Sequence, residues 1–211
     1  MRRKPRNADA RDCEPQPLAF AAPGSAPQPF TVAEIEQVEV WMNYASNAAT
    51  NTLNKQLLVP LCLGAGLRTE EASCLTWAHV YSNETGAMLL DVAGRDVPMS
   101  QRYAAPLVHG KNQYRPDQFV LAHDSTKADR SNIASNISSM CYSKSLEPKP
   151  ARLRVTWIQH FINAGVDDDL ICLAAGTTAL RRYEHLCPTQ DYSAETIRAW
   201  FHGPREGLHS V

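Results

Sequence analysis

The sequence lacks an apolar run long enough to cross a bilayer. It begins with a basic stretch, residues 1–6, but the apolar core of a secretory signal does not follow. C-x-x-C pairs are also missing, which counts against a zinc site or a disulfide framework. We therefore expect a cytoplasmic protein with no membrane segment and no metal, and buried free thiols on the apolar helix faces that carry Cys62, Cys74 and Cys172.

An excess of charge of one sign is missing as well. The chain has 21 Lys and Arg against 22 Asp and Glu, a net charge of −1. A surface that neutralises nucleic-acid phosphates usually needs clustered Lys and Arg, so this balance counts against a strongly DNA-binding surface. Local basic patches are still compatible with it, and the clearest are residues 1–6 and the pair Arg181-Arg182.

The length and the composition indicate one domain with a tail. The 211 residues and a hydrophobic content of 44% are ordinary for a soluble globular protein. Residues 1–29 are rich in proline and charge and show little periodicity, so we expect a disordered arm there. The arm is either a solvated tail or a basic segment that contacts DNA phosphates. We expect the domain itself at 30–205 and a short tail at 206–211.

Helical patterns dominate the expected domain. Thr31 and Glu34 have the spacing of a capping box, which predicts a helix that runs to about Tyr44. A second helix is expected at about 50–64, where Pro60 is a candidate for a kink. Shorter helices should follow Arg68 and surround Tyr183. Further helices are expected at about 101–110, 131–143, 151–163, 168–176 and 194–201.

Two short segments have the pattern of strands instead. Residues 87–92 and 96–99 predict a small hairpin joined at Ala93-Gly94-Arg95. Residues 117–121 read as a short buried strand or a loop. The predicted fold class is therefore α+β, mainly helical, with a small antiparallel sheet.

Two arginines and a tyrosine are the candidate chemical groups. Arg68 begins a short amphipathic helix, Arg154 lies in the helix 151–163, and Tyr183 follows further along the chain. Guanidinium groups bind the non-bridging oxygens of a phosphodiester in a fork. A phenol can attack phosphorus as a covalent nucleophile. These residue types can therefore form a phosphodiester site.

The order of four sequence fragments resembles the catalytic domain of tyrosine recombinases, the phage-integrase family. The fragments are G-L-R-x-x-E-x-x-x-L-x-W at 66–77, L-R-x-T at 153–156, A-G-V-D at 164–167 and R-Y-E-H-L at 182–186. The resemblance implies a mainly helical catalytic domain that acts on double-stranded DNA, without a cofactor, as copies assembled on the DNA. It also implies DNA recombination or integration, as in a mobile element.

The resemblance also implies roles for single residues. Arg68 and Arg154 match the arginines that contact the scissile phosphate, and Tyr183 matches the nucleophile that forms a 3′-phosphotyrosine. Glu71 matches a glutamate that supports the local structure. Ordinary alternatives stay open: a helix-start arginine in a salt bridge, and a tyrosine whose ring packs at a helix end.

Three departures from the family pattern affect proton transfer. Ala151 stands where the family has a histidine, and Thr177 stands where a second histidine or a tryptophan follows Gly176. The hairpin has no lysine, and its nearest basic residue, Arg95, is a poor proton donor near neutral pH. We treat Arg95 and Thr177 as supporting residues only.

Arg181, Arg182 and Arg152 are candidate contacts to the DNA backbone, although Arg152 also fits an ordinary surface charge. Two functions fit the family resemblance. One is a compact, active tyrosine recombinase. The other is a DNA-binding protein that keeps the fold without the reaction and serves as a regulator or accessory factor of a mobile element. An unrelated helical protein is the remaining alternative.

Overall fold

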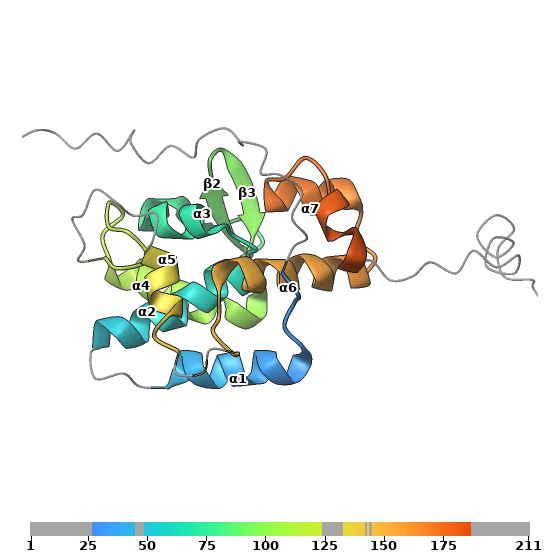
Figure 1. Ribbon diagram of the computed structural model, residues 1–211. Helices are drawn as coiled ribbons and strands as arrows, with labels where there is room; N and C mark the ends of the chain where they lie inside the picture. The colour runs from blue at the N-terminus through green and yellow to red at the C-terminus, as the bar shows by residue number, and fades with distance from the viewer. Residues whose placement is uncertain (1–26, 45–48, 124–132, 142, 144, 187–211) are drawn as a thin grey trace, which may run out of the picture.

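The computed structural model describes residues 27–44, 49–123, 133–141, 143 and 145–186 as a mainly helical body with one small sheet (Figure 1). The expected arm up to residue 26, the expected helix at 194–201 and the tail at 206–211 lie outside these residues. The elements are α1 (Val32–Asn43), α2 (Ala49–Val59), α3 (Thr69–Cys74), β1 (Val80–Ser82), β2 (Met88–Val92), β3 (Arg95–Pro98), α4 (Ala105–Gln113), α5 (Ile133–Ser138), α6 (Pro150–Asn163) and α7 (Asp168–Ala175). The predicted fold class is confirmed.

Helix α6 runs through the middle of the molecule. Helix α1 lies on one side of it, while α3, the β2–β3 hairpin and α7 lie on the other (Figure 1). The predicted start of α1 is confirmed, because the Thr31 hydroxyl accepts the Glu34 N–H at 3.3 Å and the Glu34 carboxylate accepts the Thr31 N–H at 2.8 Å. At the other end of α1, the buried Lys55 ammonium donates to the Tyr44 carbonyl and joins α1 to α2.

The expected kink at Pro60 takes the form of a π-helical turn. Helix α2 ends at Val59, and Pro60–Gly64 continue as a buried π turn. Proline has no N–H to donate and its ring displaces the preceding turn, so the regular bonding pattern is interrupted there. The chain then passes through Gly66, where φ is +64°. A Cβ on Gly66 would lie 2.6 Å from the Trp157 indole, so glycine lets this turn approach α6 closely.

The sheet has three antiparallel strands in the order β1-β2-β3. The predicted hairpin is confirmed, with Leu90 opposite Val97. Its turn is one residue shorter than expected: Ala93 and Gly94 both have positive φ, as in a type I′ turn, and Arg95 already belongs to β3. Strand β1 was not predicted, because a segment of three residues is too short to show alternation.

Two predicted helices have different limits in the structure. The helix expected at 131–143 is Ile133–Ser138. The helix expected at 101–110 is a 3-10 turn, Gln101–Tyr103, followed by α4 up to Gln113. Residues 117–121 form no regular strand, and Phe119 makes a single bridge with Thr76.

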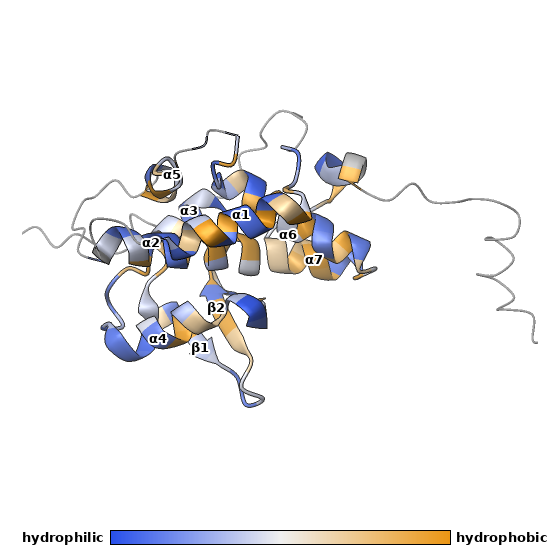
Figure 2. Ribbon diagram, turned by 90° about the horizontal axis from the view of Figure 1, so that it is seen from below, coloured by the Kyte–Doolittle hydropathy of each residue, from blue (hydrophilic) through white to orange (hydrophobic). Residues whose placement is uncertain are grey.

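The buried side chains form a large cluster around α2 and the sheet and a smaller one between α6, α7 and the 3-10 turn Arg181–Leu186. Hydrophobic and hydrophilic residues alternate along the helices, as Figure 2 shows for α1. Val155, Ile158, Ile171 and Tyr183 belong to the smaller cluster. This packing fixes the 3-10 turn against α6. No helix among the described residues is long and apolar enough to span a membrane.

Candidate active site

Three arginines from distant parts of the chain converge on the end of α7. Arg68 is the N-cap of α3 and is half-buried, Arg95 opens β3, and Arg154 lies in the second turn of α6 and is buried. Each guanidinium donates to one of three successive carbonyls at this helix end. The pairs are Arg95 Nε with Ala174 O at 3.3 Å, Arg154 Nη2 with Ala175 O at 2.7 Å, and Arg68 Nη2 with Gly176 O.

The end of a helix suits this arrangement. Its last carbonyls have no partner within the helix and form the negative end of the helix dipole, so they attract cations. An Asp167 cap fixes the other end of α7, where the Asp167 carboxylate accepts the Asp169 N–H at 2.9 Å. One short helix therefore sets the relative positions of the three guanidinium groups.

Glu71 joins two of these arginines through different oxygens. Its Oε1 accepts from Arg95 Nη2 at 2.7 Å, and its Oε2 accepts from the backbone N–H of Arg68 at 2.8 Å. Glu71 is buried, so the charge is paired and hydrogen-bonded as burial requires. This position is compatible with the supporting role expected for Glu71, because the carboxylate fixes the backbone from which Arg68 extends.

Arg154 is the most buried of the three arginines. Its Nη1 donates to the Gly66 carbonyl and its Nη2 to that of Ala175, so the guanidinium bridges the loop before α3 and the end of α7. Burial lowers the pKa of Arg154, and a hydrogen bond and attraction from the Tyr183 side chain oppose this shift. The neighbouring Arg68 lowers the same pKa further. Because Arg154 and Arg68 bind the successive carbonyls of Ala175 and Gly176, and Arg154 interacts with Tyr183, the three side chains lie at one place.

Tyr183 reaches this place from the 3-10 turn Arg181–Leu186. Tyr183 is only 3% exposed, so its ring is packed inside the protein. Its side chain also interacts with Arg154. The ordinary alternative of a packed ring and the expected role as nucleophile are therefore compatible. The burial holds the phenol in place, and the contact with Arg154 sets its direction.

Gly176 makes the close approach of the arginines possible. It has φ of +62° as the C-cap of α7, and a Cβ there would lie 2.6 Å from Arg95 Cζ. Thr177 follows, and its hydroxyl donates to the Ala179 carbonyl at 3.3 Å. The threonine hydroxyl is thus occupied in the turn that leads to Tyr183.

The structure also describes the surroundings of the positions that depart from the family pattern. Ala151 is exposed at the start of α6. Arg95 is bound by Glu71 and the α7 end, which gives it a structural place in the site. The carbonyls of Gly66 and Ala174–Gly176 are the partners that the sequence did not reveal, because a backbone acceptor has no residue type to recognise.

The three candidate DNA contacts have different surroundings. Arg152 Nη2 lies 2.8 and 2.9 Å from the two Glu34 oxygens, and its Cζ is 3.8 Å from the centre of the Phe30 ring. Arg152 therefore fastens the segment before α1 to α6, and we do not retain it as a DNA contact. Arg181 and Arg182 are exposed beside Tyr183, and their predicted contact with DNA stays a prediction.

The cluster has the chemical groups for binding a tetrahedral anion. An arginine has five N–H donors, and the described contacts use one side-chain bond of Arg68 and three of Arg154, including that with Tyr183. Donors therefore remain for phosphate oxygens, and a phenol lies next to them. No described side chain beside them matches the family's proton-transferring histidine or lysine.

The chain is similar to known proteins in sequence and in fold. The model of the phage integrase family matches residues 32–195. No curated protein matches the chain. Among solved structures, the chain is similar to XerA recombinase, with 15% identity, a TM-score of 0.53, and coverage of 89% of this chain and 68% of the other.

Two solved complexes with DNA are also similar. XerH site-specific recombinase bound to its difH substrate has 16% identity and a TM-score of 0.58, over 86% of this chain and 56% of the other. Tn1549 transposon integrase with circular intermediate DNA has 15% identity and a TM-score of 0.50, over 81% and 64%. The chain thus spans little more than half the length of XerH. The structural likeness shows the fold, and the family match over most of the sequence shows that this chain belongs to the phage integrase family, the tyrosine recombinases.

Proposed function

We propose that the protein binds double-stranded DNA and that Arg68, Arg154 and Tyr183 act on one phosphodiester of it. The observation that carries the proposal is the position of Arg154: it donates to the Ala175 carbonyl, next to the Gly176 carbonyl that Arg68 binds, and it interacts with Tyr183. Three residues spaced over more than a hundred positions thus lie in one cluster, which supports their joint action on one phosphate. The similar XerH and Tn1549 structures are complexes with DNA, which supports DNA as the substrate.

In this proposal the guanidinium groups of Arg68 and Arg154 bind the non-bridging oxygens and stabilise the charge that builds up on them. The Tyr183 oxygen attacks phosphorus and loses its proton. The bond from phosphorus to the 5′ oxygen breaks, and that oxygen takes up a proton and leaves as a hydroxyl. The product is a 3′-phosphotyrosine that keeps the ester energy for rejoining to another strand. Such strand exchange needs copies of the chain assembled on DNA.

The second candidate function is a DNA-binding regulator or accessory factor without the reaction. The observation in its favour is that Ala151 and Thr177 stand at the histidine positions while Arg95 is bound to Glu71. Each missing proton-transferring group costs about 10² to 10⁴ in rate. Solvent must then accept the proton of Tyr183 and supply that of the 5′ oxygen.

Covalent trapping on nicked DNA separates these functions. The DNA carries sequence that flanks the gene, and the nick lets a short fragment escape after attack, so the adduct accumulates. Tyr183→Phe removes the nucleophile. Tyr81→Phe is the matched control, because it removes a phenol in β1 whose hydroxyl interacts with Asp96.

A denaturant-resistant adduct that Tyr183→Phe abolishes and Tyr81→Phe preserves would support the recombinase. DNA binding without an adduct would support the regulator. Absence of both binding and adduct at low salt would overturn the proposal.

A further inference from the structure

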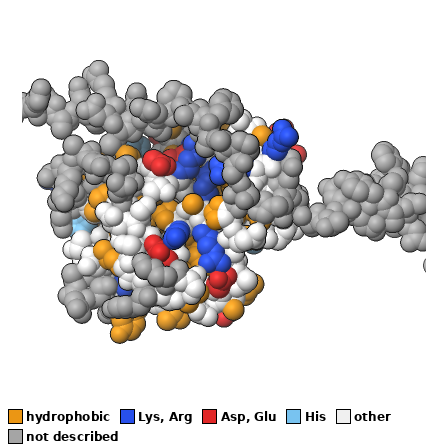
Figure 3. All heavy atoms as spheres, viewed as in Figure 1, with side chains coloured by type: hydrophobic (Ala, Val, Ile, Leu, Met, Phe, Trp, Pro, Cys, Tyr) orange, Lys and Arg blue, Asp and Glu red, His pale blue; other side chains and the backbone are white. Residues whose placement is uncertain are grey.

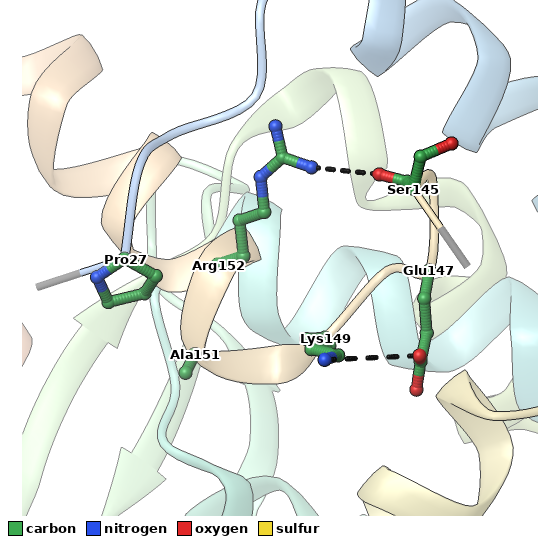
Figure 4. Close-up of a pocket in the computed structure, with 6 residues that line it drawn as sticks. All are labelled: Pro27, Ser145, Glu147, Lys149, Ala151 and Arg152. Carbon is green, nitrogen blue, oxygen red and sulfur yellow. Dashed lines mark hydrogen bonds and ion pairs between the residues drawn. The ribbon is translucent and has the colours of Figure 1, made fainter.

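Two hollows meet at the start of α6, next to the arginine cluster but outside it. The first has a volume of about 260 Å³ and is lined by Pro27, Ser145, Glu147, Lys149, Ala151 and Arg152 (Figure 4). The second, of about 250 Å³, is lined by Thr69, Ser135, Ser138, Glu147, Lys149, Pro150 and Ala151. Glu147, Lys149 and Ala151 line both, so Lys149 stands where the two hollows adjoin.

Lys149 is the positively charged side chain of these two hollows that is available to bind a ligand. Its side chain is 64% exposed, and within the described part of the chain it makes one ion pair, with Glu147 at 4.0 Å. The Glu147 side chain is only 13% exposed, but the Lys149 ammonium lies in solvent and is at the outer limit of an ion pair, so the pair holds Lys149 weakly. The other cation of the first hollow, Arg152, is held by both oxygens of Glu34 and stacks on Phe30. A phosphate therefore competes easily for Lys149 and not for Arg152.

The second hollow also offers two hydroxyl groups. Thr69 is half-buried and Ser135 is exposed, and neither side chain makes a hydrogen bond in the described part of the chain. The Ser138 hydroxyl is different, because it donates to the Ser135 carbonyl at 2.9 Å. Thr69 and Ser135 can thus donate to an oxygen ligand while Lys149 supplies the charge.

The second hollow lies between the two elements that carry Arg68 and Arg154. Thr69 directly follows Arg68, and Lys149 precedes Arg154 by five residues. Lys149 is the N-cap of α6, so it stands at the start of the helix that carries Arg154. On the face of the molecule that Figure 3 shows, Lys and Arg side chains gather with acidic ones near the centre.

We propose that Lys149, with the hydroxyls of Thr69 and Ser135, binds a backbone phosphate of the DNA strand whose scissile phosphate lies at Arg68 and Arg154. The inference rests on the proposed function and adds a residue to which neither the family pattern nor the sequence had pointed. Lys149 holds the strand in register, and it takes no part in the chemical step.

Lys149→Gln tests the inference, and Lys111→Gln is its matched control. Lys111 is an exposed lysine near the end of α4 that lines neither hollow. Both variants lose one positive charge from an exposed side chain, so both should fold as the wild type does. Binding to a fluorescent duplex of random sequence, about 30 base pairs long, is followed by anisotropy over a series of salt concentrations. Neutralising one phosphate changes the slope of log K against log salt by about 0.9.

We expect Lys149→Gln to weaken binding about 3- to 10-fold at low salt and to reduce that slope by about one, while Lys149→Arg and Lys111→Gln keep the wild-type slope. If the wild type binds and Lys149→Gln keeps its affinity and slope, the inference is overturned and the proposed function stands. An equal loss in Lys111→Gln would also overturn it, because the effect would then be one of net charge. A wild type that binds no duplex overturns both.

Discussion

Substitution of Gly176 by alanine should disrupt the arginine cluster from its centre. The residue has φ of +62°, and the added Cβ would lie 2.6 Å from Arg95 Cζ and 2.7 Å from its Nη1. The Arg95 guanidinium is the end of a flexible side chain, but it is held by Glu71 Oε1 at 2.7 Å and the Ala174 carbonyl. It can move away only by giving up these bonds.

Two separate losses in the free energy of unfolding add up in Gly176→Ala. A left-handed conformation costs an alanine about 1–2 kcal/mol. Forcing a methyl group against a fixed neighbour costs about 1–3 kcal/mol more. We therefore expect Gly176→Ala to lower the free energy of unfolding by about 2–5 kcal/mol. Because Glu71 also holds the backbone of Arg68, binding of phosphate-bearing ligands should weaken as well.

Gly165→Ala is the matched control, since Gly165 follows α6 with φ of +71° and has no atom within 4 Å of an added Cβ. It should lose only the backbone term, about 1–2 kcal/mol. Urea denaturation of both variants gives the difference. In an Arg95→Ala background the steric conflict is absent, so Gly176→Ala should also lose only the backbone term. The coupling energy between the two substitutions should therefore be about 1–3 kcal/mol. Equal losses in Gly176→Ala and Gly165→Ala would refute the steric argument.

Three further substitutions test other parts of the structure. Arg154→Lys should lower the free energy of unfolding by about 1.5–3 kcal/mol in urea denaturation, because an ammonium group cannot bridge the carbonyls that the guanidinium joins; unchanged stability would contradict this. Ala151→His should raise the rate of adduct formation on nicked DNA by about 10²-fold, because residue 151 stands at the family's histidine position and is exposed; an unchanged rate would count against that. The hydrogen bond from the Thr31 backbone and, second, that from Arg152 lower the pKa of Glu34 in the folded protein below 4.5. The ionised Glu34 therefore stabilises the fold fully above that pH, and this contribution is lost as the pH falls further. Urea denaturation over a pH series should thus show a flatter acid limb for Glu34→Gln, and parallel curves would sink the assignment.

Local signals in the sequence were sufficient for much of the fold. The capping box of Thr31 and Glu34 located the start of α1. Pro60 marked an irregular turn, although its π form depends on how the surrounding core packs. Strand β1 was missed because three residues pair with β2 through backbone bonds that no side-chain pattern reports.

The site was predictable only as a set of residue types. Arg68, Arg154 and Tyr183 were recognised from their order, and the structure brings them together. Their individual roles stay predictions. The carbonyl partners were not predictable, because any residue type supplies a backbone oxygen. Arg152 shows the converse limit: a basic residue that resembled a surface charge is committed to Glu34 by the path of the chain before α1.

The use of helix carbonyls as partners has a consequence for charge. Arg68, Arg95 and Arg154 are held largely by neutral dipoles, and of the groups bonded to them within the described residues only Glu71 is an anion. Three positive charges less one negative charge leave two. Carboxylates in place of the α7 carbonyls would have cancelled that remainder. A chain with a net charge of −1 can thus keep a strongly positive point in its interior, where the low dielectric strengthens the attraction of a phosphate.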